Sequence, residues 1–208
     1  MFLISYKGFL NIFDMDLSEK RFEQDIESYF LSHGVRRISP QEYDRENMIF
    51  PNVLEEFVSA SQPMAWEKYK KLYGENAVSK LIHRLNTAIS NSNALDVLKK
   101  GVKDMGIEIA LCYFKPSSNI NQELVRLYNA NIVGVTRQFP YSSKNSNTID
   151  MVLSVNGIPL FAFELKNQFK GQDVTNAIHQ WESDCRRSRK CGVRQPSGKR
   201  LSYILFAV

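Results

Sequence analysis

Two apolar segments, residues 148–155 and 158–165, are separated only by Asn156 and Gly157. An Asn-Gly pair between two strand-like segments is the strongest short-range signal of a β-hairpin, because both residues tolerate the positive φ angles of a two-residue turn. The sequence therefore predicts an antiparallel hairpin over residues 148–165, and the rest of the chain must pack around it.

Other periodicities predict helices before this hairpin and further strands on both sides of it. We expect a first helix that starts near Asp16, several helices over residues 40–91 with a break at Gln62-Pro63, and helices over residues 94–103 and 173–189. Strand patterns occupy residues 107–113, 132–139 and 201–208. The last of these is apolar without alternation, which predicts burial on both faces and, since the chain stops there, a fragment of a longer protein. The order of elements predicts an α/β fold with a helical N-terminal half.

The first helix carries apolar and acidic residues side by side. Its apolar residues recur at helical spacing and are expected to face the core: Phe22, Ile26, Tyr29 and Phe30. Glu23 and Glu27 lie beside this stripe. Without a further role, they are ordinary charges at the edge of an amphipathic helix.

The composition is that of one globular domain: 208 residues, of which 43% are hydrophobic and 24% charged. No apolar run approaches the roughly 18 residues of a membrane-spanning helix. Lys7 and Asn11 interrupt the apolar start of the chain, which argues against a signal peptide. The three cysteines lack the spacing of a zinc site. We expect a soluble, cytoplasmic protein with reduced thiols and no membrane partner.

Positive charge is concentrated at the C-terminal end. The chain has 27 Lys and Arg against 22 Asp and Glu, a formal net charge of +5. Residues 1–150 contain 18 of each sign, and residues 151–208 contain 9 basic and 4 acidic side chains. The cluster consists of Arg186, Arg187, Arg189, Lys190, Arg194, Lys199 and Arg200. It fits either the binding of DNA phosphates or the solvated end of a helix, whose dipole cations also complement.

The hairpin segment also carries three candidate catalytic residues: Asp150, Glu164 and Lys166. Two carboxylates that converge on one point repel each other unless a cation lies between them, and such hard oxygen ligands suit Mg²⁺ or Mn²⁺. A neighbouring lysine can position an attacking water. This pattern indicates metal-assisted hydrolysis of phosphodiester bonds. The alternative is a surface strand with an ion pair, although Glu164 follows an apolar stretch where a charge needs a reason.

The catalytic interpretation makes a prediction about strand register. A two-residue turn with regular pairing sets Asp150 opposite Phe163 and places Glu164 on the other face of the sheet. One extra residue, either in the turn or as a β-bulge, pairs Val155 with Pro159 and sets Asp150 opposite Glu164 instead. We therefore predict a three-residue turn or a bulge.

Several segments of the chain resemble the N-terminal nuclease domain of the restriction (R) subunit of type I restriction-modification enzymes. Near the hairpin these are NTID (147–150), VNGIPL (155–160), FELKN (163–167) and GQDVTNAIHQ (171–180). Upstream, QPMAW (62–66), VLKKGV (97–102), Asn131 and VTRQ (135–138) are also similar to that family. Together these segments span most of the chain from about Leu17 to Val208.

The resemblance implies a PD-(D/E)xK restriction-endonuclease-like core, in which a mixed β-sheet is flanked by helices. It assigns the residues as follows: Asp150 and Glu164 bind the metal, Lys166 serves the attacking water, and Gln180 hydrogen-bonds the active-site groups or DNA. A glutamate of the first helix completes the acidic cluster, for which we favour Glu23 over Glu27. Asp184 stands where relatives often carry a tyrosine, and Ile149 stands where the motif often has proline.

The resemblance further implies an endonuclease domain over residues 17–208, with an N-terminal extension over residues 1–16. Its helical insertion would cover about residues 40–103 and its catalytic core about residues 104–208. The domain would cut double-stranded DNA with Mg²⁺, and Arg186, Arg187, Arg189 and Lys190 would grip phosphates. Motor domains outside this chain would use ATP, and modification and specificity subunits would supply target recognition. The alternatives are a non-catalytic DNA-binding or assembly module of the same fold, or another PD-(D/E)xK nuclease that acts in repair or junction resolution.

Overall fold

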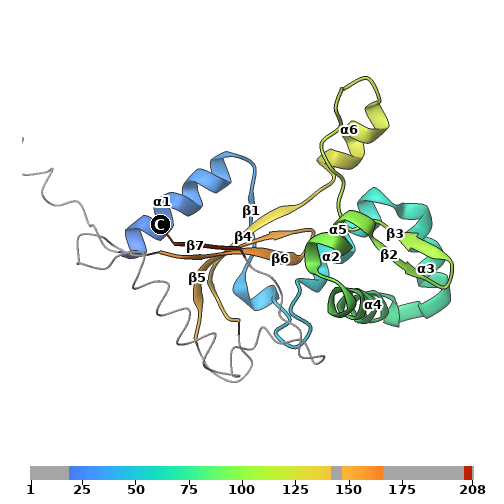
Figure 1. Cartoon of the computed structure of the whole chain (residues 1–208), viewed down its shortest axis with the longest axis horizontal. Helices are drawn as coiled ribbons and strands as arrows, with labels where there is room; N and C mark the ends of the chain where they lie inside the picture. The colour runs from blue at the N-terminus through green and yellow to red at the C-terminus, as the bar shows by residue number, and fades with distance from the viewer. Residues whose placement is uncertain (1–18, 142–146, 166–203, 208) are drawn as a thin grey trace, which may run out of the picture.

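The computed structural model describes residues 19–141, 147–165 and 204–207 (Figure 1). Its helices are α1 (Glu19–Ser32), α2 (Pro51–Ser61), α3 (Pro63–Tyr73), α4 (Ala77–Asn91), α5 (Ala94–Lys100) and α6 (Gln122–Asn129), with short 3-10 turns at η3 (Pro40–Glu42) and η4 (Gly74–Asn76). Its strands are β1 (Arg36–Arg37), β2 (Val102–Asp104), β3 (Ile107–Ile109), β4 (Val133–Phe139), β5 (Ile149–Val155), β6 (Ile158–Glu164) and β7 (Ile204–Ala207). The fold is mixed α/β with a helical N-terminal half, as the sequence predicts.

The main sheet has the strand order β1-β4-β5-β6-β7. Its two central pairings, β4 with β5 and β5 with β6, are antiparallel, and the two outer pairings are parallel. Helix α1 lies against one face of this sheet (Figure 1), where the ring of Phe30 packs 6.1 Å from the ring of Phe163. The resulting sheet is mixed, and the predicted hairpin forms its centre.

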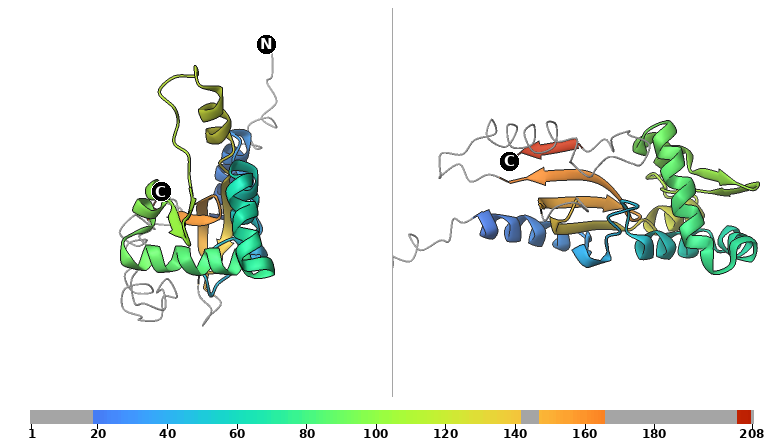
Figure 2. Two further views of the ribbon diagram at one scale, coloured as in Figure 1. Left: turned by 90° about the vertical axis from the view of Figure 1, so that its right-hand side faces the viewer. Right: turned by 90° about the horizontal axis from the view of Figure 1, so that it is seen from below.

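Helices α2 to α5 and the small β2–β3 sheet form a helical unit, residues 51–109, at one end of the main sheet (Figures 1 and 2). Local sequence explains its boundaries. Proline begins both α2 and α3, where its missing N–H costs no helical hydrogen bond. The side chain of Asn93 accepts a hydrogen bond from the backbone of Asp96 and so caps α5.

The hydrophobic core runs without a break from the helical unit into the sheet. The tip of the β5–β6 hairpin packs on the start of α2, where the N–H of Phe50 donates to the carbonyl of Gly157 at 2.9 Å. Asn156 is fully buried, and its side-chain amide donates to the carbonyl of Leu111 at 2.8 Å and to Oδ1 of Asn131 at 2.9 Å. These bonds join the hairpin tip to the segments that enter and leave the helical unit.

Most of the predicted elements are present, with shifted ends. The break at Gln62-Pro63 separates α2 from α3, and the strands predicted over residues 132–139, 148–155 and 158–165 are confirmed within one residue at each end. The strand predicted over 107–113 stops at Ile109, because both backbone groups of Ala110 bond to the side-chain amide of Gln62 instead of a strand. The helix predicted over 94–103 stops at Lys100, where Gly101 turns with a φ of 70°.

The burial of α1 differs from the prediction. Phe22 and Tyr29 are exposed, whereas Glu23 and Glu27 are buried against the sheet. A helix buries charged side chains in this way only when partners are present, and these partners come from β4, as described below. The predicted apolar stripe is therefore wrong for two of its members.

Helix α6 was not predicted; it projects beyond the sheet (Figures 1 and 2) and is joined to the end of α2, where the Arg126 guanidinium donates to the carbonyls of Ala60 and Ser61 at 3.4 and 3.5 Å. Asn121 caps it by accepting hydrogen bonds from the N–H groups of Glu123 and Leu124. No helix within the described ranges is both long enough and apolar enough to cross a bilayer. The predicted helix over residues 173–189 lies outside the described residues.

Candidate metal site at the end of the central hairpin

The central hairpin closes with a two-residue turn. Val155 pairs directly with Ile158, and the two residues between them, Asn156 and Gly157, have φ angles of 52° and 85°. Positive φ at both central positions is the geometry that the Asn-Gly pair favours. The extra residue that the catalytic interpretation requires is therefore not in the turn.

The extra residue lies in a β-bulge beyond the turn. Ser154 pairs with Pro159, but the next residue of β5, Leu153, pairs with Phe161, so Leu160 has no counterpart. Pro159 has no N–H to contribute to a ladder of backbone hydrogen bonds, which favours an irregularity at this point of a strand. The predicted bulge is confirmed, but the predicted pairing of Val155 with Pro159 is wrong, because the extra residue lies beyond the turn and Val155 still pairs with Ile158.

The bulge sets the register of the two acidic residues. Met151 pairs with Phe163, and continuing this antiparallel register by one residue brings Asp150 opposite Glu164. Directly opposite residues in an antiparallel pair lie on the same face of the sheet, with their Cβ atoms about 5 Å apart. A regular hairpin would have placed Asp150 and Glu164 on opposite faces.

Both carboxylates lie in a partly enclosed environment. Glu164 is only 8% exposed, and Asp150 is half-buried. One oxygen of Asp150, Oδ2, accepts a hydrogen bond of 2.8 Å from the backbone N–H of Leu165. This bond fixes the orientation of the Asp150 carboxylate relative to the end of β6.

The strand on the other side of β5 contributes Gln138. Arg137 pairs with Met151 and Phe139 with Ile149, so Gln138 lies opposite Asp150. Gln138 has a φ of 49°, a left-handed conformation that is uncommon for a residue with a side chain and costs free energy. Strain of this kind persists only where surrounding contacts hold it, and here those contacts come from α1 and from Thr148.

Glu23 of α1 is the acid that Gln138 contacts. The Gln138 amide donates to both oxygens of Glu23, at 3.1 and 3.2 Å, and its own oxygen accepts from the Thr148 hydroxyl at 3.0 Å. Arg137 also binds Glu23, with an Nη2–Oε2 distance of 3.0 Å. Glu23 is thus joined to the strand next to β5 through one neutral and one cationic side chain.

Glu27 lies one turn further along α1 and shares the same arginine. Arg137 Nη1 lies 3.4 Å from Oε2 of Glu27, and Arg37 of β1 donates to both oxygens of Glu27, at 2.8 and 3.1 Å. Both glutamate side chains are 8% exposed, and that of Arg137 is 22% exposed. Arg137 and Arg37 together balance the charges of the two buried acids, with Arg137 shared between them, which explains how α1 can bury them against the sheet.

The structure brings together some of the predicted site residues and not others. It aligns Asp150 with Glu164, but no group of three His, Cys, Asp or Glu side chains suited to a metal ion occurs among the residues it describes. Glu23, our choice as a third ligand, is engaged by Arg137 and Gln138. The other predicted site residues, Lys166, Gln180, Arg186, Arg187, Arg189 and Lys190, lie outside the described residues, as does Asp184.

Sequence reasoning assigned no role to Arg137 and Gln138. Both belong to the segment VTRQ, which resembles the restriction-subunit family, so that resemblance was the only signal that could have singled them out. Their contacts with Glu23 join residues more than a hundred positions apart, which no local pattern predicts.

Comparison with known proteins decides the family. The family model of the N terminus of type I restriction enzyme R proteins matches residues 16–208. The chain belongs to this family. A domain of this kind is PD-(D/E)xK-like, in agreement with the mixed sheet described above. No curated protein and no solved structure matches the chain.

The residues of this R-protein domain fit the metal dependence that is typical of its nuclease family. The carboxylates of Asp150 and Glu164 lie in register on adjacent strands. Their oxygen atoms are hard donors, the type of ligand that Mg²⁺ prefers. The donor chemistry therefore suits Mg²⁺ or Mn²⁺.

Proposed function

We propose that this R-protein domain is a Mg²⁺-dependent endonuclease that hydrolyses phosphodiester bonds of double-stranded DNA. The observation that carries the proposal is the register of Asp150 with Glu164, which depends on the bulge at Leu160. A strand pair without function has no need of an extra residue that sets two acids side by side, since like charges in that position repel. The family of the chain supports the same function.

In this proposal Asp150 and Glu164 would hold the metal ion, and the bound ion would supply a more acidic attacking water and stabilisation of negative charge on the phosphate. Mn²⁺ is expected to replace Mg²⁺, because it accepts the same oxygen ligands. The partial burial of Glu164 strengthens the electrostatic interaction of the site with a cation relative to an exposed carboxylate.

The remaining roles rest on the sequence. Lys166 follows Glu164 by two residues, and we assign it to the orientation of the attacking water. Gln180 is assigned to hydrogen bonds with the site or with DNA. The basic residues from Arg186 to Lys190 are assigned to phosphate binding next to the site, without reading of bases.

Glu23 keeps its proposed place as a third acid of the site, with a condition that the fold adds. The Glu23 carboxylate is already bound by Arg137 and Gln138. Its negative charge is therefore partly balanced by Arg137 before a metal ion binds. We therefore expect Glu23 to contribute less to catalysis than Asp150 or Glu164.

The family also suggests the setting of the reaction. In a type I restriction complex, modification and specificity subunits would select the target, and ATP-driven translocation by motor domains would bring DNA to this nuclease domain. ATP would bind outside the present chain. The domain itself is then expected to cut with little sequence preference.

The test is nicking of supercoiled plasmid DNA by the assembled restriction complex with Mg²⁺ and ATP. We expect Asp150→Ala, Glu164→Gln and Lys166→Ala each to reduce the nicking rate by about a hundredfold or more, as for loss of a group that acts in the transition state. Glu56→Gln is the matched control, because Glu56 is an exposed acid on α2 that pairs with Arg36 far from the hairpin end.

Wild-type nicking by all three variants would contradict the nuclease function. Retained ATP hydrolysis by the same complexes shows that each variant subunit is folded and assembled. If the wild-type complex itself never nicks DNA while the chain still binds duplex DNA, the domain is a non-catalytic DNA-binding or assembly module of the same fold.

A further inference from the structure

The helical unit carries a concentration of positive charge that the overall balance of the chain conceals. Between Ala77 and Lys103 the sequence has five Lys and Arg but only one acid, Asp96, a local excess of 5 − 1 = 4. The five cations are Lys80, Arg84, Lys99, Lys100 and Lys103, and all are exposed. Helix α4 contains no acidic residue at all. Residues 1–150 balance to zero only because this excess is offset elsewhere.

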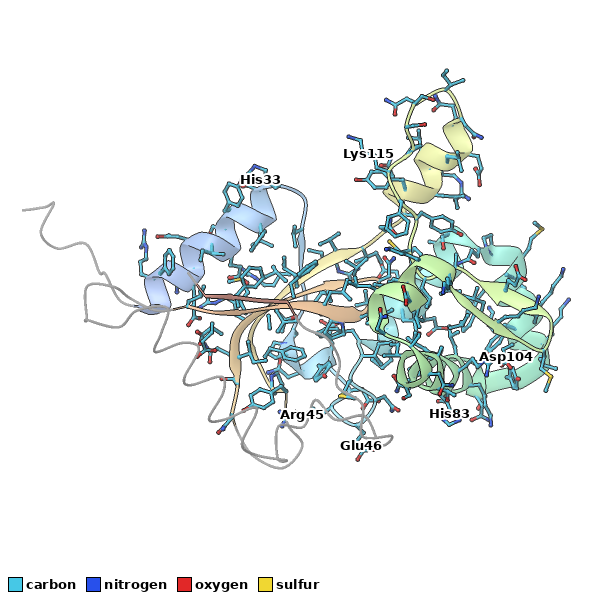
Figure 3. All side chains as sticks on the ribbon, viewed as in Figure 1. His33, Arg45, Glu46, His83, Asp104 and Lys115 are labelled. Carbon is cyan, nitrogen blue, oxygen red and sulfur yellow. The ribbon has the colours of Figure 1, made fainter. Side chains whose placement is uncertain are left out.

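Contacts of α4 with α5 and with β2 bring together the three elements that carry these five cations. Arg84 Nε of α4 donates to the carbonyl of Lys103 of β2 at 2.9 Å, which ties the two elements together. Lys80 lies four residues before Arg84, one helical turn away on the same face. Lys100 ends α5 three residues before Lys103, within about 11 Å along the chain. Figure 3 labels His83, which precedes Arg84 on α4, and Asp104, which follows Lys103 on β2. We call these five cations the α4–β2 basic surface.

The acids around this surface neutralise little of it. Glu108 pairs with Lys103 at 2.7 Å, and Asp96 accepts a hydrogen bond from Asn93 at the far end of α5. The Asp104 carboxylate accepts hydrogen bonds from Tyr69 and Tyr73 at 2.8 and 2.9 Å. No ion pair joins the other four cations to an acid within the part of the chain that the structure describes.

The chemistry of this surface favours the phosphate backbone of a duplex. Clustered, exposed lysines bind phosphates by releasing the counterions that surround DNA, without regard to sequence. Surfaces for single strands add exposed aromatic rings on which bases stack. The exposed aromatic side chains of the described residues lie on α1 and near α6, not on α4, α5 or β2: Phe22, Tyr29, Phe114 and Tyr128.

We propose that the α4–β2 basic surface binds the phosphate backbone of double-stranded DNA at a place remote from the Asp150–Glu164 pair. The helical unit contacts the tip of the hairpin, whereas Asp150 lies five residues further along β5, about 17 Å from Val155. A straight duplex of twenty base pairs is about 70 Å long and can reach both places. The inference rests on the proposed function for the identity of the polymer, but not on hydrolysis.

The test measures duplex binding by the 208-residue chain as a function of salt, by fluorescence anisotropy with a labelled mixed-sequence duplex and no divalent metal. In the variant Lys80→Gln/Lys100→Gln, we expect the slope of log affinity against log salt to become shallower by about two, one for each lost phosphate contact. Affinity at moderate salt should fall by about tenfold. Lys80→Arg/Lys100→Arg keeps both charges and should bind as the wild type does.

The matched control is Lys68→Gln/Lys71→Gln, which removes the same charge from exposed positions on α3. We expect it to keep the wild-type slope, because these lysines do not belong to the α4–β2 basic surface. Equal loss in the two double variants would mean that only the net charge matters, and the proposal would fall. It would also fall if Lys80→Gln/Lys100→Gln bound duplex DNA like the wild type but lost binding to polyglutamate, which would indicate an acidic protein partner.

The outcome is separable from that of the nicking experiment. If Lys80→Gln/Lys100→Gln weakens duplex binding while the complex never nicks DNA, the nuclease function fails and this surface stands. If the complex nicks DNA and Lys80→Gln/Lys100→Gln binds duplex DNA as the wild type does, the nuclease function is supported and the proposed role of this surface is wrong.

Discussion

The backbone N–H of Leu165 donates a 2.8 Å hydrogen bond to the carboxylate of Asp150. Asp150 therefore has a structural role, as an acceptor for a buried stretch of backbone, in addition to the charge that the proposed reaction needs. The two roles can be separated by substitution, because asparagine keeps an acceptor oxygen and loses the charge, whereas alanine loses both.

We expect Asp150→Ala to lower the free energy of unfolding by about 1 kcal/mol, since the Leu165 N–H loses its acceptor. Asp150→Asn should retain most of the wild-type stability, yet both variants should fail to nick DNA. Urea unfolding of the chain and plasmid nicking by the complex measure the two effects. If Asp150→Asn still nicks DNA and only the destabilised Asp150→Ala does not, Asp150 has a structural role only.

Arg137 supports the second prediction, because it binds two glutamates that α1 buries. Removing one partner of a buried ion pair leaves an uncompensated charge, so we expect Arg137→Ala to lower the free energy of unfolding by about 3 kcal/mol or more. The control is Arg37→Ala. Arg37 holds both oxygens of Glu27, but its own side chain is 64% exposed and Glu27 keeps its 3.4 Å contact with Arg137 when Arg37 is removed, so the expected loss is smaller, about 1 kcal/mol.

Urea unfolding of both variants checks this difference. A cost for Arg137→Ala no larger than that for Arg37→Ala would mean that Glu23 and Glu27 become solvated without their arginine. In that case α1 would not depend on Arg137 for its place on the sheet.

The parts of the fold that the sequence predicts well are those that short segments determine. The Asn156-Gly157 turn follows from the backbone preferences of two residues, and it fixes where β5 and β6 pair. The bulge was predictable as well, once Asp150 and Glu164 were required to share a face. Both conclusions use only residues within a single hairpin.

The predictions that were wrong concern residues whose contacts are made by side chains far away in the sequence. The strand predicted to run to Tyr113 ends at Ile109, because the side chain of Gln62, forty-eight positions before Ala110, takes over its backbone hydrogen bonds. The exposed Phe22 and the buried Glu23 have the same cause, since Arg137 makes the acidic face of α1 the one that packs. Charge counts averaged over 150 residues likewise concealed the basic surface of the helical unit.

A third prediction concerns Gly157, where two constraints coincide. Its φ is 85°, and a Cβ added there would lie 2.6 Å from the carbonyl oxygen of Phe50. Gly34 provides the control, because its φ is 83° and a Cβ there meets nothing within 4 Å. Gly34→Ala should therefore cost only the left-handed backbone strain, about 1 kcal/mol.

Gly157→Ala adds a collision with backbone and disturbs the Phe50–Gly157 hydrogen bond, so we expect a loss of about 3 kcal/mol or more. Thermal unfolding of the two variants gives the comparison. Similar melting temperatures for both would show that the hairpin tip can move away from α2 at little cost, contrary to the close contact described here.

The last prediction concerns alkaline pH. Burial, together with a hydrogen bond to Asp104, raises the pKa of the Tyr69 hydroxyl above its ordinary value. The unfolded chain then releases this proton first, at about pH 10, so the stabilisation is fully present below that pH and is lost as the pH rises above it. In Tyr69→Phe no proton is present to be released. That variant should be less stable than the wild type by about 1 kcal/mol near neutral pH, but should lose less of its stability between neutral pH and about pH 11.

Urea unfolding at the two pH values measures both effects. The control is Tyr128→Phe, which alters an exposed ring on α6 and is expected to match the wild type. Equal losses for wild type and Tyr69→Phe would show that Tyr69 ionises no later in the folded chain than in the unfolded one.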